Sequence, residues 1–198
     1  MNNSQTRLAN LLGALAVGIS DRIRLAAAEK TSMSGEAAAA LIVIGHMVGL
    51  SINQLGRILK LSHPGTVRVV DRLVAAGLAV RKPALTDRRV LALHLTPAGE
   101  TERSAVLEGR RVAIFAVMDQ VSPDDYPVLE LLVEKMLASL LCDATSAISV
   151  CRLCDQQACP ACPMSKFESN GPQGKLNGPA RPASLKVDPS VKTLCRLI

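Results

Sequence analysis

Aromatic residues are nearly missing from this 198-residue chain, which has no Trp, one Tyr and two Phe. Proteins that bind RNA loops or single strands usually stack bases on aromatic side chains, so those modes of binding are disfavoured. Hydrophobic residues nevertheless make up 48% of the chain. We therefore expect a sizeable core of Leu, Val, Ile and Ala, which favours helices packed closely through small residues.

Long apolar runs and catalytic residue sets are also scarce. No run reaches the ~20 apolar residues that a membrane-spanning helix needs. The stretch Leu8–Ile19 is apolar like a signal-peptide core, but its pattern continues at helical spacing to Arg24 without a convincing cleavage site. We therefore predict a cytoplasmic protein. Only three His occur, none close in sequence to a plausible catalytic partner, so we expect no enzymatic activity.

Capping residues and apolar spacing predict one domain over residues 4–143. Ser51 and Ser62 suit helix N-caps, and Gly77 suits a helix C-cap. The expected fold class is mainly α with a small two-stranded β wing, a winged helix-turn-helix flanked by long dimerisation helices. Helices are expected over residues 4–29, 35–48, 52–59, 63–76, 97–121 and 122–143, and strands over residues 78–82 and 90–95.

Positive charge is concentrated between residues 51 and 96. The formal net charge is +6, but much of that excess lies after Pro163. Two helices joined by a tight turn and followed by a charged hairpin are typical of a winged helix that binds double-stranded DNA. An ordinary solvated helix face is the alternative, and the order of the elements disfavours it. Only Asp71 and Asp87 are acidic in this region, whereas its basic residues are Arg57, Lys60, Arg68, Arg72, Arg81, Lys82, Arg88 and Arg89.

The helix after Ser62 is the candidate recognition helix, because the major groove admits a helix whose first residues reach base edges. Arg68 is the best candidate for a bidentate contact to a guanine. Arg88 and Arg89 at the hairpin tip suit an adjacent minor groove, and Asp87 is expected to orient Arg89. The predicted DNA-contacting residues are Ser62, His63, Gly65, Thr66, Arg68, Arg72, Arg88 and Arg89. The predicted core positions of the same helix are Val67, Val70, Leu73 and Val74.

The segments SHPGTVRVVDRLVAAGLAVRK and TDRRVLALHLTPAGE resemble the winged helix of the MarR family of bacterial transcription regulators. The most specific matches are the D-x-R of the wing (Asp87, Arg89) and the closing L-T-x-x-G (Leu95, Thr96, Gly99). The resemblance covers about residues 8–142. It implies a homodimer with interleaved first and last helices, which binds a pseudo-palindromic operator in double-stranded DNA and usually represses transcription. The wing is shorter before its aspartate than is common in the family.

Four of the six cysteines form the pattern Cys151-x-x-Cys154-x4-Cys159-x-x-Cys162. In a cytoplasmic protein this spacing is better explained by a metal site than by structural disulfides. Four thiolates can close a tetrahedral zinc site, and clustered cysteines also hold iron–sulfur clusters, although the ferredoxin spacing is not matched. A metal-free thiol switch is the third alternative, because exposed C-x-x-C pairs oxidise readily. The sequence predicts one metal centre, zinc or iron–sulfur, as a sensor or as a staple for the end of the chain.

The sequence as a whole therefore predicts a dimeric, sequence-specific transcription regulator, a repressor, with residues 151–162 as its input. The alternative from another class is an iron–sulfur redox or electron-transfer protein on a helical scaffold, which leaves the basic helix face unexplained. Repression relieved by a small-molecule effector, bound between the dimerisation helices and the DNA-binding unit, is a further alternative. His46 is expected to be a hydrogen-bonded core histidine, and residues 167–198 a disordered basic tail.

Overall fold

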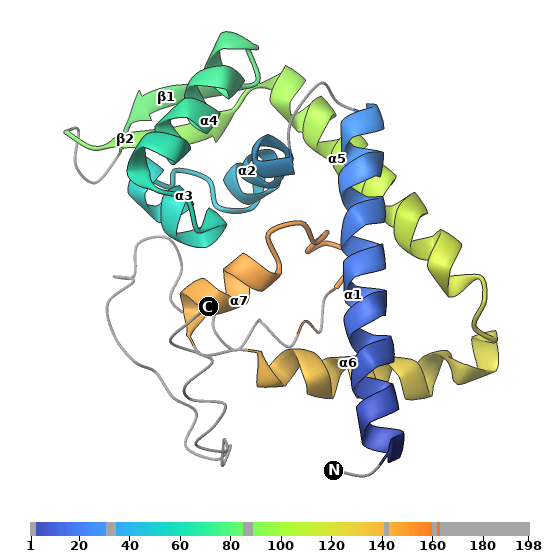
Figure 1. The fold of residues 1–198 in the computed structure, drawn as a ribbon. Coiled ribbons are helices and arrows are strands. Elements are labelled where there is room, and N and C mark those ends of the chain that lie inside the picture. The colour runs from blue at the N-terminus through green and yellow to red at the C-terminus, as the bar shows by residue number, and fades with distance from the viewer. Residues whose placement is uncertain (1–2, 31–34, 85–88, 141–142, 160–161, 163–198) are drawn as a thin grey trace.

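The computed structural model describes residues 3–30, 35–84, 89–140, 143–159 and 162. It is mainly helical with one two-stranded antiparallel sheet, which confirms the expected fold class (Figure 1). None of the described helices is long and apolar enough to cross a membrane. The elements are α1 (Asn3–Lys30), α2 (Gly35–His46), α3 (Ile52–Leu59), α4 (His63–Ala75), β1 (Ala79–Pro83), β2 (Leu91–Leu95), α5 (Pro97–Met118), a 3-10 turn (Pro123–Asp125), α6 (Tyr126–Ser139) and α7 (Ala144–Val150).

Residues 35–95, which we call the winged-helix unit, are built around α2. Its apolar residues Ala37–Ile44 are all buried, as expected for a helix that is apolar all round. In Figure 1, α3, α4, the hairpin and α5 surround this helix. The core is completed by residues that α3, α4 and the strands turn toward α2, namely Leu50, Leu55, Ile58, Val69, Val70, Leu73, Leu78, Ala79 and Leu93.

The hairpin pairs β1 and β2 in antiparallel register from Ala79↔Leu95 to Pro83↔Leu91. A short segment before α3 extends this sheet, because Leu93 N donates to Leu50 O at 2.9 Å and Gly49 N donates to Leu93 O at 3.1 Å. The base of the wing is therefore fastened to the helical core, which fixes the direction in which its tip projects.

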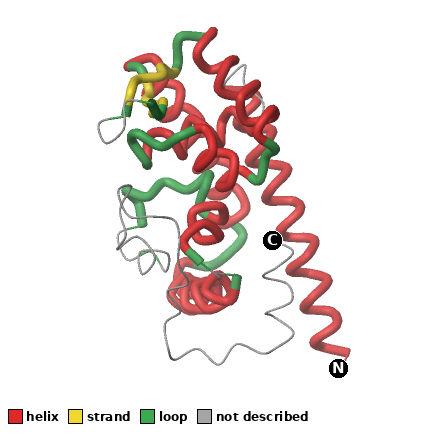
Figure 2. The backbone as a smooth tube through the Cα atoms, turned by 90° about the vertical axis from the view of Figure 1, so that its left-hand side faces the viewer, coloured by secondary structure: helices red, strands yellow, loops and turns green. Residues whose placement is uncertain are grey.

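The long helices lie outside the winged-helix unit. α1 packs along α5, and α6 follows α5 after a change of direction at the 3-10 turn (Figure 1). Turned by 90°, the view in Figure 2 shows the N-terminal half of α1 extending away from the rest of the molecule. This half is solvent-exposed on all sides in the single chain, including its leucines.

Helix boundaries differ from expectation at three places. α2 ends at His46 instead of residue 48, and α5 ends at Met118 instead of residue 121. The helix expected over 122–143 is divided into the 3-10 turn and α6, and a further helix, α7, was not predicted. Asp143 begins α7 instead of ending α6, because its side chain accepts a hydrogen bond from Ser146 N at 2.7 Å. The predicted tail, residues 167–198, lies outside the described residues.

Candidate nucleic-acid interface

The helix-turn-helix is shaped by two capped helices. Ser51 and Gln54 form a reciprocal capping box at the start of α3, with Ser51 N donating to Gln54 Oε1 at 2.8 Å. Lys60 ends α3 in the left-handed conformation (φ 56°), which turns the chain sharply toward α4. Ser62 then caps α4 by accepting from Gly65 N at 3.3 Å. These local bonds set the tight turn that the sequence predicts.

The closest approach of α3 to α4 joins Gly56 and Thr66. A Cβ atom placed on Gly56 would lie only 2.7 Å from Thr66 Oγ1. Thr66 is fully buried, and its hydroxyl donates to Ser62 O at 3.0 Å. The prediction that Thr66 contacts DNA is therefore wrong, because this side chain fills the space between the two helices. The prediction that Val67 lies in the core is also wrong, because Val67 is half-exposed. Val69 is buried in its place.

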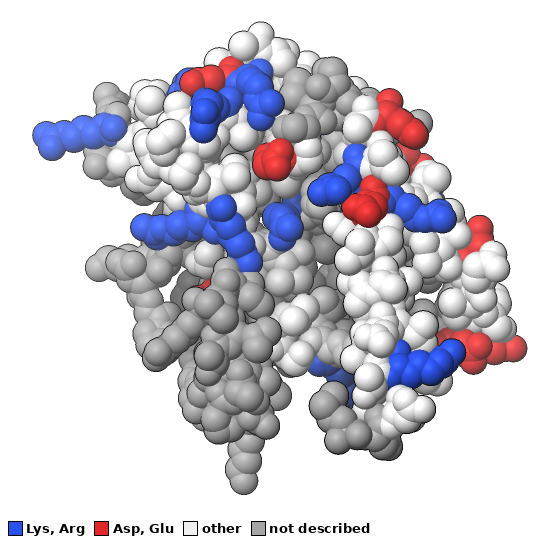
Figure 3. All heavy atoms as spheres, in the orientation of Figure 1, with Lys and Arg blue, Asp and Glu red and all other residues white. Residues whose placement is uncertain are grey.

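The outer face of α4 carries the remaining predicted contacts. The side chains of Ser62, His63, Arg68 and Arg72 are exposed, and Gly65 is half-buried. Figure 3 shows Lys and Arg side chains projecting where the winged-helix unit lies, whereas basic and acidic side chains alternate over α1 and α5. The structure therefore exposes Arg68 and Arg72 on the outer side of α4, with Ser62 and His63 exposed at its start, as a recognition helix requires.

Helix α3 adds side chains that sequence reasoning did not assign as contacts. Asn53, Arg57 and Lys60 are exposed on α3. Asn53 Oδ1 lies 2.9 Å from His63 Nδ1 at the start of α4, so these two polar side chains hold each other in place. The basic residues of α3 were counted in the charge of the region, but Asn53 gave no signal because an isolated Asn is common on any helix surface.

The wing contributes one described arginine at its tip. Arg89 is exposed beside β2, whereas Arg88 and Asp87 lie outside the described residues. Arg81 on β1 instead forms a 2.5 Å ion pair with Asp71 on α4. This ion pair joins the wing to the recognition helix. Arg81 is therefore engaged within the winged-helix unit.

Comparison with known proteins agrees with this geometry. Residues 31–90 match the MarR family. A segment of 59 residues is 41% identical to a putative transcriptional regulatory protein for the hcr operon of Thauera aromatica, covering 30% of this chain and 36% of that protein. The matched segment thus spans about a third of the curated relative's length.

Solved structures show that the MarR-type fold extends well beyond that segment. A MarR family protein from Bacillus stearothermophilus is 24% identical, with a TM-score of 0.60 over 69% of this chain and 95% of that chain. The YusO protein of Bacillus subtilis is 20% identical, with a TM-score of 0.57 over 69% and 97%. Streptococcus pneumoniae FabT, solved in complex with DNA, is 19% identical, with a TM-score of 0.54 over 67% and 94%. At these identities the likeness shows the fold alone.

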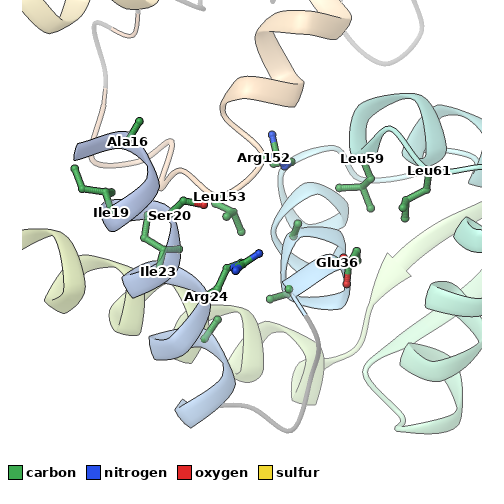
Figure 4. Close-up of a pocket in the computed structure, with 14 residues that line it drawn as sticks. Ala16, Ile19, Ser20, Ile23, Arg24, Glu36, Leu59, Leu61, Arg152 and Leu153 are labelled. Carbon is green, nitrogen blue, oxygen red and sulfur yellow. The ribbon is translucent and has the colours of Figure 1, made fainter. Parts of the chain in front are cut away.

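Beyond the MarR-type unit, α7 places the cysteine segment, which we define as residues 151–162. Ala147 and Ser149 are buried, and Ile148 packs against the core of the winged-helix unit. The next residues, Arg152 and Leu153, face the junction of α1 and α2, where Leu153 packs beside buried Ala38 and Ile42 (Figure 4). The start of the cysteine segment is thus packed into the domain. The Asp143-x-x-Ser146 capping pattern is the sequence signal that could have predicted it.

The four cysteines come together in two turns. Cys154 N donates to Cys151 O at 2.8 Å, and Cys162 N donates to Cys159 O at 3.1 Å. Cys154 and Cys162 both raise the pKa of Cys151, and burial followed by Cys162 raises the pKa of Cys159, so these thiols lie near one another. Within the described ranges, no group of three or more His, Cys, Asp or Glu side chains is already spaced as a metal site. The metal centre therefore stays a prediction, and the finding is that the cysteines lie in two C-x-x-C turns near each other.

Charge around these thiols is uneven. The hydrogen bond from Cys151 lowers the pKa of Cys154 to about 6, and the nearby guanidinium groups of Arg110 and Arg152 act in the same direction. Arg110 donates to Cys154 Sγ at 3.7 Å. The same Cys151–Cys154 bond, together with burial, raises the pKa of Cys151. One thiolate in this pair is therefore stabilised by its neighbours.

His46 connects the cysteine segment to the end of α2. Its Nε2 lies 2.9 Å from Cys154 O, and Arg103 of α5 donates to its Nδ1 at 3.0 Å. Because Nδ1 accepts from Arg103, the ring proton is on Nε2 and donates to the carbonyl. Burial, and then the charge of Arg103, lower the pKa of His46. The expectation of a hydrogen-bonded histidine is confirmed, and its partners join α2, α5 and the cysteine segment.

A cavity of about 440 Å³ lies between α1, α2 and the cysteine segment. Figure 4 shows Ile19 and Ile23 on the α1 side, with Arg152 and Leu153 on the side of the cysteine segment. Most of its lining is apolar, and three charged side chains, Arg24, Glu36 and Arg152, also line it. This combination suits a small molecule with an apolar body and one charged group.

The outer faces of the long helices are strongly apolar. An exposed Leu on α1 or α6 is unremarkable alone, but so many exposed apolar residues on three helices are unusual for a monomer. α6 has no fully buried residue. The exposed large apolar residues of α1, α5 and α6 are Leu8, Leu11, Leu12, Leu15, Val17, Leu25, Val112, Phe115, Val128, Leu131, Leu132, Val133, Met136 and Leu140.

Proposed function

We propose that this protein is a homodimeric transcription regulator that binds a pseudo-palindromic site in double-stranded DNA and represses transcription. The observation that carries the proposal is the exposed basic face of α4, held by a capped helix-turn-helix inside a MarR-type winged-helix unit. Arg68 and Arg72 lie on this face, one helical turn apart, and are exposed. A helix presented in this way fits the major groove of B-DNA.

Different residues make the base contacts and the phosphate contacts with DNA in this arrangement. Arg68 is the side chain that reads a base, by a bidentate contact to guanine. His63, held by Asn53, and the capped start of α4 bind the phosphate backbone and set the position of the helix. Arg89 of the wing extends the contact to the neighbouring minor groove.

Dimerisation follows from the exposed apolar faces of α1, α5 and α6. One helix-turn-helix gains affinity mainly when a two-fold partner binds a second half-site. The apolar faces extend away from the winged-helix unit (Figure 2), so a partner that covers them leaves both recognition helices accessible. The long helices therefore set the distance between the two DNA-binding units.

The site that regulates DNA binding lies where the long helices meet the winged-helix unit. The cavity of Figure 4 would take a small effector with an apolar body, and the cysteine segment forms part of its wall. Occupation of the cavity, or a change at the cysteines, alters how α1 and α2 pack. An electron-transfer function is not favoured, because it does not explain why exposed basic residues gather on α4.

Replacement of Arg68 by alanine tests the DNA-binding proposal. The expected result is a loss of about 1–3 kcal/mol in discrimination at one base pair of each half-site, because a bidentate contact is removed. The DNA would be a duplex selected from a random library by the wild-type protein, and affinity would be measured by fluorescence anisotropy. Arg111→Ala removes the same charge from α5 and should leave both affinity and specificity unchanged. Equal effects of the two variants would refute the assignment of α4.

Replacement of Leu132 by arginine tests the dimer. A charge on the exposed apolar face of α6 should produce a monomer and lower DNA affinity, because only one half-site is then bound at a time. Light scattering after size-exclusion chromatography measures the mass, and circular dichroism checks that helices are retained. Glu130→Arg places an arginine at another exposed position of α6, one that is already charged, and is the matched control. A monomeric wild-type protein that still binds a palindromic duplex cooperatively would contradict the proposal.

A further inference from the structure

The described residues place the four cysteines in two C-x-x-C turns, each closed by a backbone hydrogen bond. Cys154 N donates to Cys151 O at 2.8 Å in the first turn, and Cys162 N donates to Cys159 O at 3.1 Å in the second. Cys154 and Cys162 both raise the pKa of Cys151, so the two turns lie near each other. In a tetrahedral zinc tetrathiolate, Zn–S bonds of about 2.3 Å place the sulfurs about 3.8 Å apart. A metal centre at this position would draw the sulfurs of the two turns to such a separation.

The charges around the cluster suit a metal held by four thiolates. Four thiolates with Zn²⁺ carry a net charge of −2, and so do four thiolates with a cubane cluster of core charge +2. Two guanidinium groups act on Cys154, those of Arg110 and Arg152. Arg110 donates directly to the Cys154 sulfur at 3.7 Å, which is the kind of outer contact that orients a ligand and offsets its charge.

The cysteine segment also contacts α2 and α5, the helices that connect the winged-helix unit to the rest of the domain. Leu153, between the first two cysteines, packs beside Ile42 of α2 and Val106 of α5. The Cys154 carbonyl accepts the His46 Nε2 proton, and His46 in turn accepts from Arg103 of α5. Gly45 leaves the space that this arginine needs, since a Cβ there would lie 2.5 Å from Arg103 Cδ. A group that holds the backbone around Cys154 in place would therefore also hold α2 against α5, through Leu153 and the His46 hydrogen bonds.

We infer that Cys151, Cys154, Cys159 and Cys162 bind one metal centre per protomer as four thiolates, and that this centre clamps the cysteine segment onto α2 and α5. Loss of the metal frees the two turns, withdraws Leu153 and releases the His46–Cys154 bond. Because α2 is the central helix of the winged-helix unit, the change reaches α3 and α4. The regulatory half of this inference rests on the proposed DNA-binding function, whereas the metal site does not.

Metal analysis of the full chain, purified without oxygen, tests the site. The expected result is one zinc per protomer in a colourless protein, or iron with acid-labile sulfide and visible absorption, and the two results identify the centre. Cys159→Ser is the main variant, because Cys159 is exposed and its replacement removes little packing. It should lower metal retention during dialysis against a chelator at least about tenfold, as should Cys154→Ser. Cys195→Ser, outside the motif, should retain the metal.

Other outcomes would overturn the site. A wild-type protein that binds neither zinc nor a reconstituted cluster would do so, as would equal retention by Cys159→Ser and Cys195→Ser. Formation of a Cys151–Cys154 disulfide in a protein that binds no metal would replace the metal centre with a thiol switch. Circular dichroism of each variant ensures that the loss of metal is compared among folded proteins.

DNA affinity before and after metal removal tests the clamp. We expect a change of at least about tenfold in the wild-type protein, which corresponds to about 1.4 kcal/mol of coupling. His46→Ala should keep the metal and lose that change, and Gly45→Ala, which displaces Arg103, should act in the same direction. Unchanged affinity in the wild-type protein on metal removal would overturn the clamp. Metal binding without any DNA binding would instead refute the proposed function and leave the metal site standing.

Discussion

Gly56→Ala is the substitution that most directly tests how α3 and α4 are held together. The added Cβ would lie 2.7 Å from Thr66 Oγ1 and 3.4 Å from Leu61 O. In an open helical position, Gly→Ala stabilises a protein by about 0.5–1 kcal/mol. Overpacking of a tight contact costs about 1–3 kcal/mol. The two effects oppose each other, so we expect a net loss of up to about 2 kcal/mol in the free energy of unfolding.

A double-mutant cycle with Thr66→Ala separates the two effects. Thr66→Ala alone loses the hydrogen bond to Ser62 O, which contributes about 0.5–1.5 kcal/mol. It also removes the oxygen that obstructs the new methyl group, so Gly56→Ala should become stabilising in that background. The expected coupling free energy is at least about 1 kcal/mol, in the direction that makes the double variant more stable than the sum of the single changes.

Urea unfolding at a fixed protomer concentration measures this cycle, since dimerisation makes apparent stability depend on concentration. Gly13→Ala is the matched control, because no atom lies within 4 Å of a Cβ at that position of α1. It should have the same effect with Thr66 or Ala at position 66. If Gly56→Ala stabilises the wild-type chain as much as Gly13→Ala does, or if the coupling is zero, the close contact between α3 and α4 is refuted.

Three further substitutions test neighbouring contacts. Gly99→Ala should destabilise the protein by about 3 kcal/mol or more in urea unfolding, because a Cβ there overlaps the Leu78 carbonyl oxygen, which is backbone and cannot rotate away. Asp71→Asn breaks the ion pair with Arg81 and should cost at most about 1 kcal/mol, less at 1 M salt, because both side chains are partly exposed. A salt-independent loss would contradict that explanation. Ser51→Ala removes the capping box of α3 and should cost about 1 kcal/mol, which Ser51→Asp should largely restore; no loss would show that the cap is dispensable.

The elements of the winged-helix unit were predictable because their signals are local. Ser51 and Ser62 cap helices as expected, and Thr96 caps α5 by the same kind of local bond. Gly77 (φ 72°) follows α4 in a Schellman arrangement, with Leu78 N bonded to Leu73 O. Each of these bonds joins residues within a few positions, so the sequence contains both partners. The order of the elements then predicted the fold class.

The surface of α4 was only partly predictable. Apolar spacing assigned Val67 to the core and Thr66 to the DNA, whereas the structure buries Thr66 and Val69. A helix that buries Thr66 and Val69 has the same periodicity as one that buries Val67. Which side of α4 is buried depends on the position of α3. Gly56 brings α3 close enough to enclose a threonine, which no property of α4 alone indicates. α7 was missed because a seven-residue helix is stabilised mainly by packing.

The sequence by itself determined the helices of the winged-helix unit, the wing, the basic region and the clustering of four cysteines, because each depends on neighbours along the chain. Only the tertiary structure decided what the cysteine segment touches. His46 and Cys154 are 108 positions apart, yet their hydrogen bond joins the end of α2 to a C-x-x-C turn. Such a contact arises when α7 packs against the winged-helix unit and sets the direction of the chain that follows it. Spacing along the sequence contains no information about that direction, because burial of Ala147 and Ile148 against distant residues fixes it.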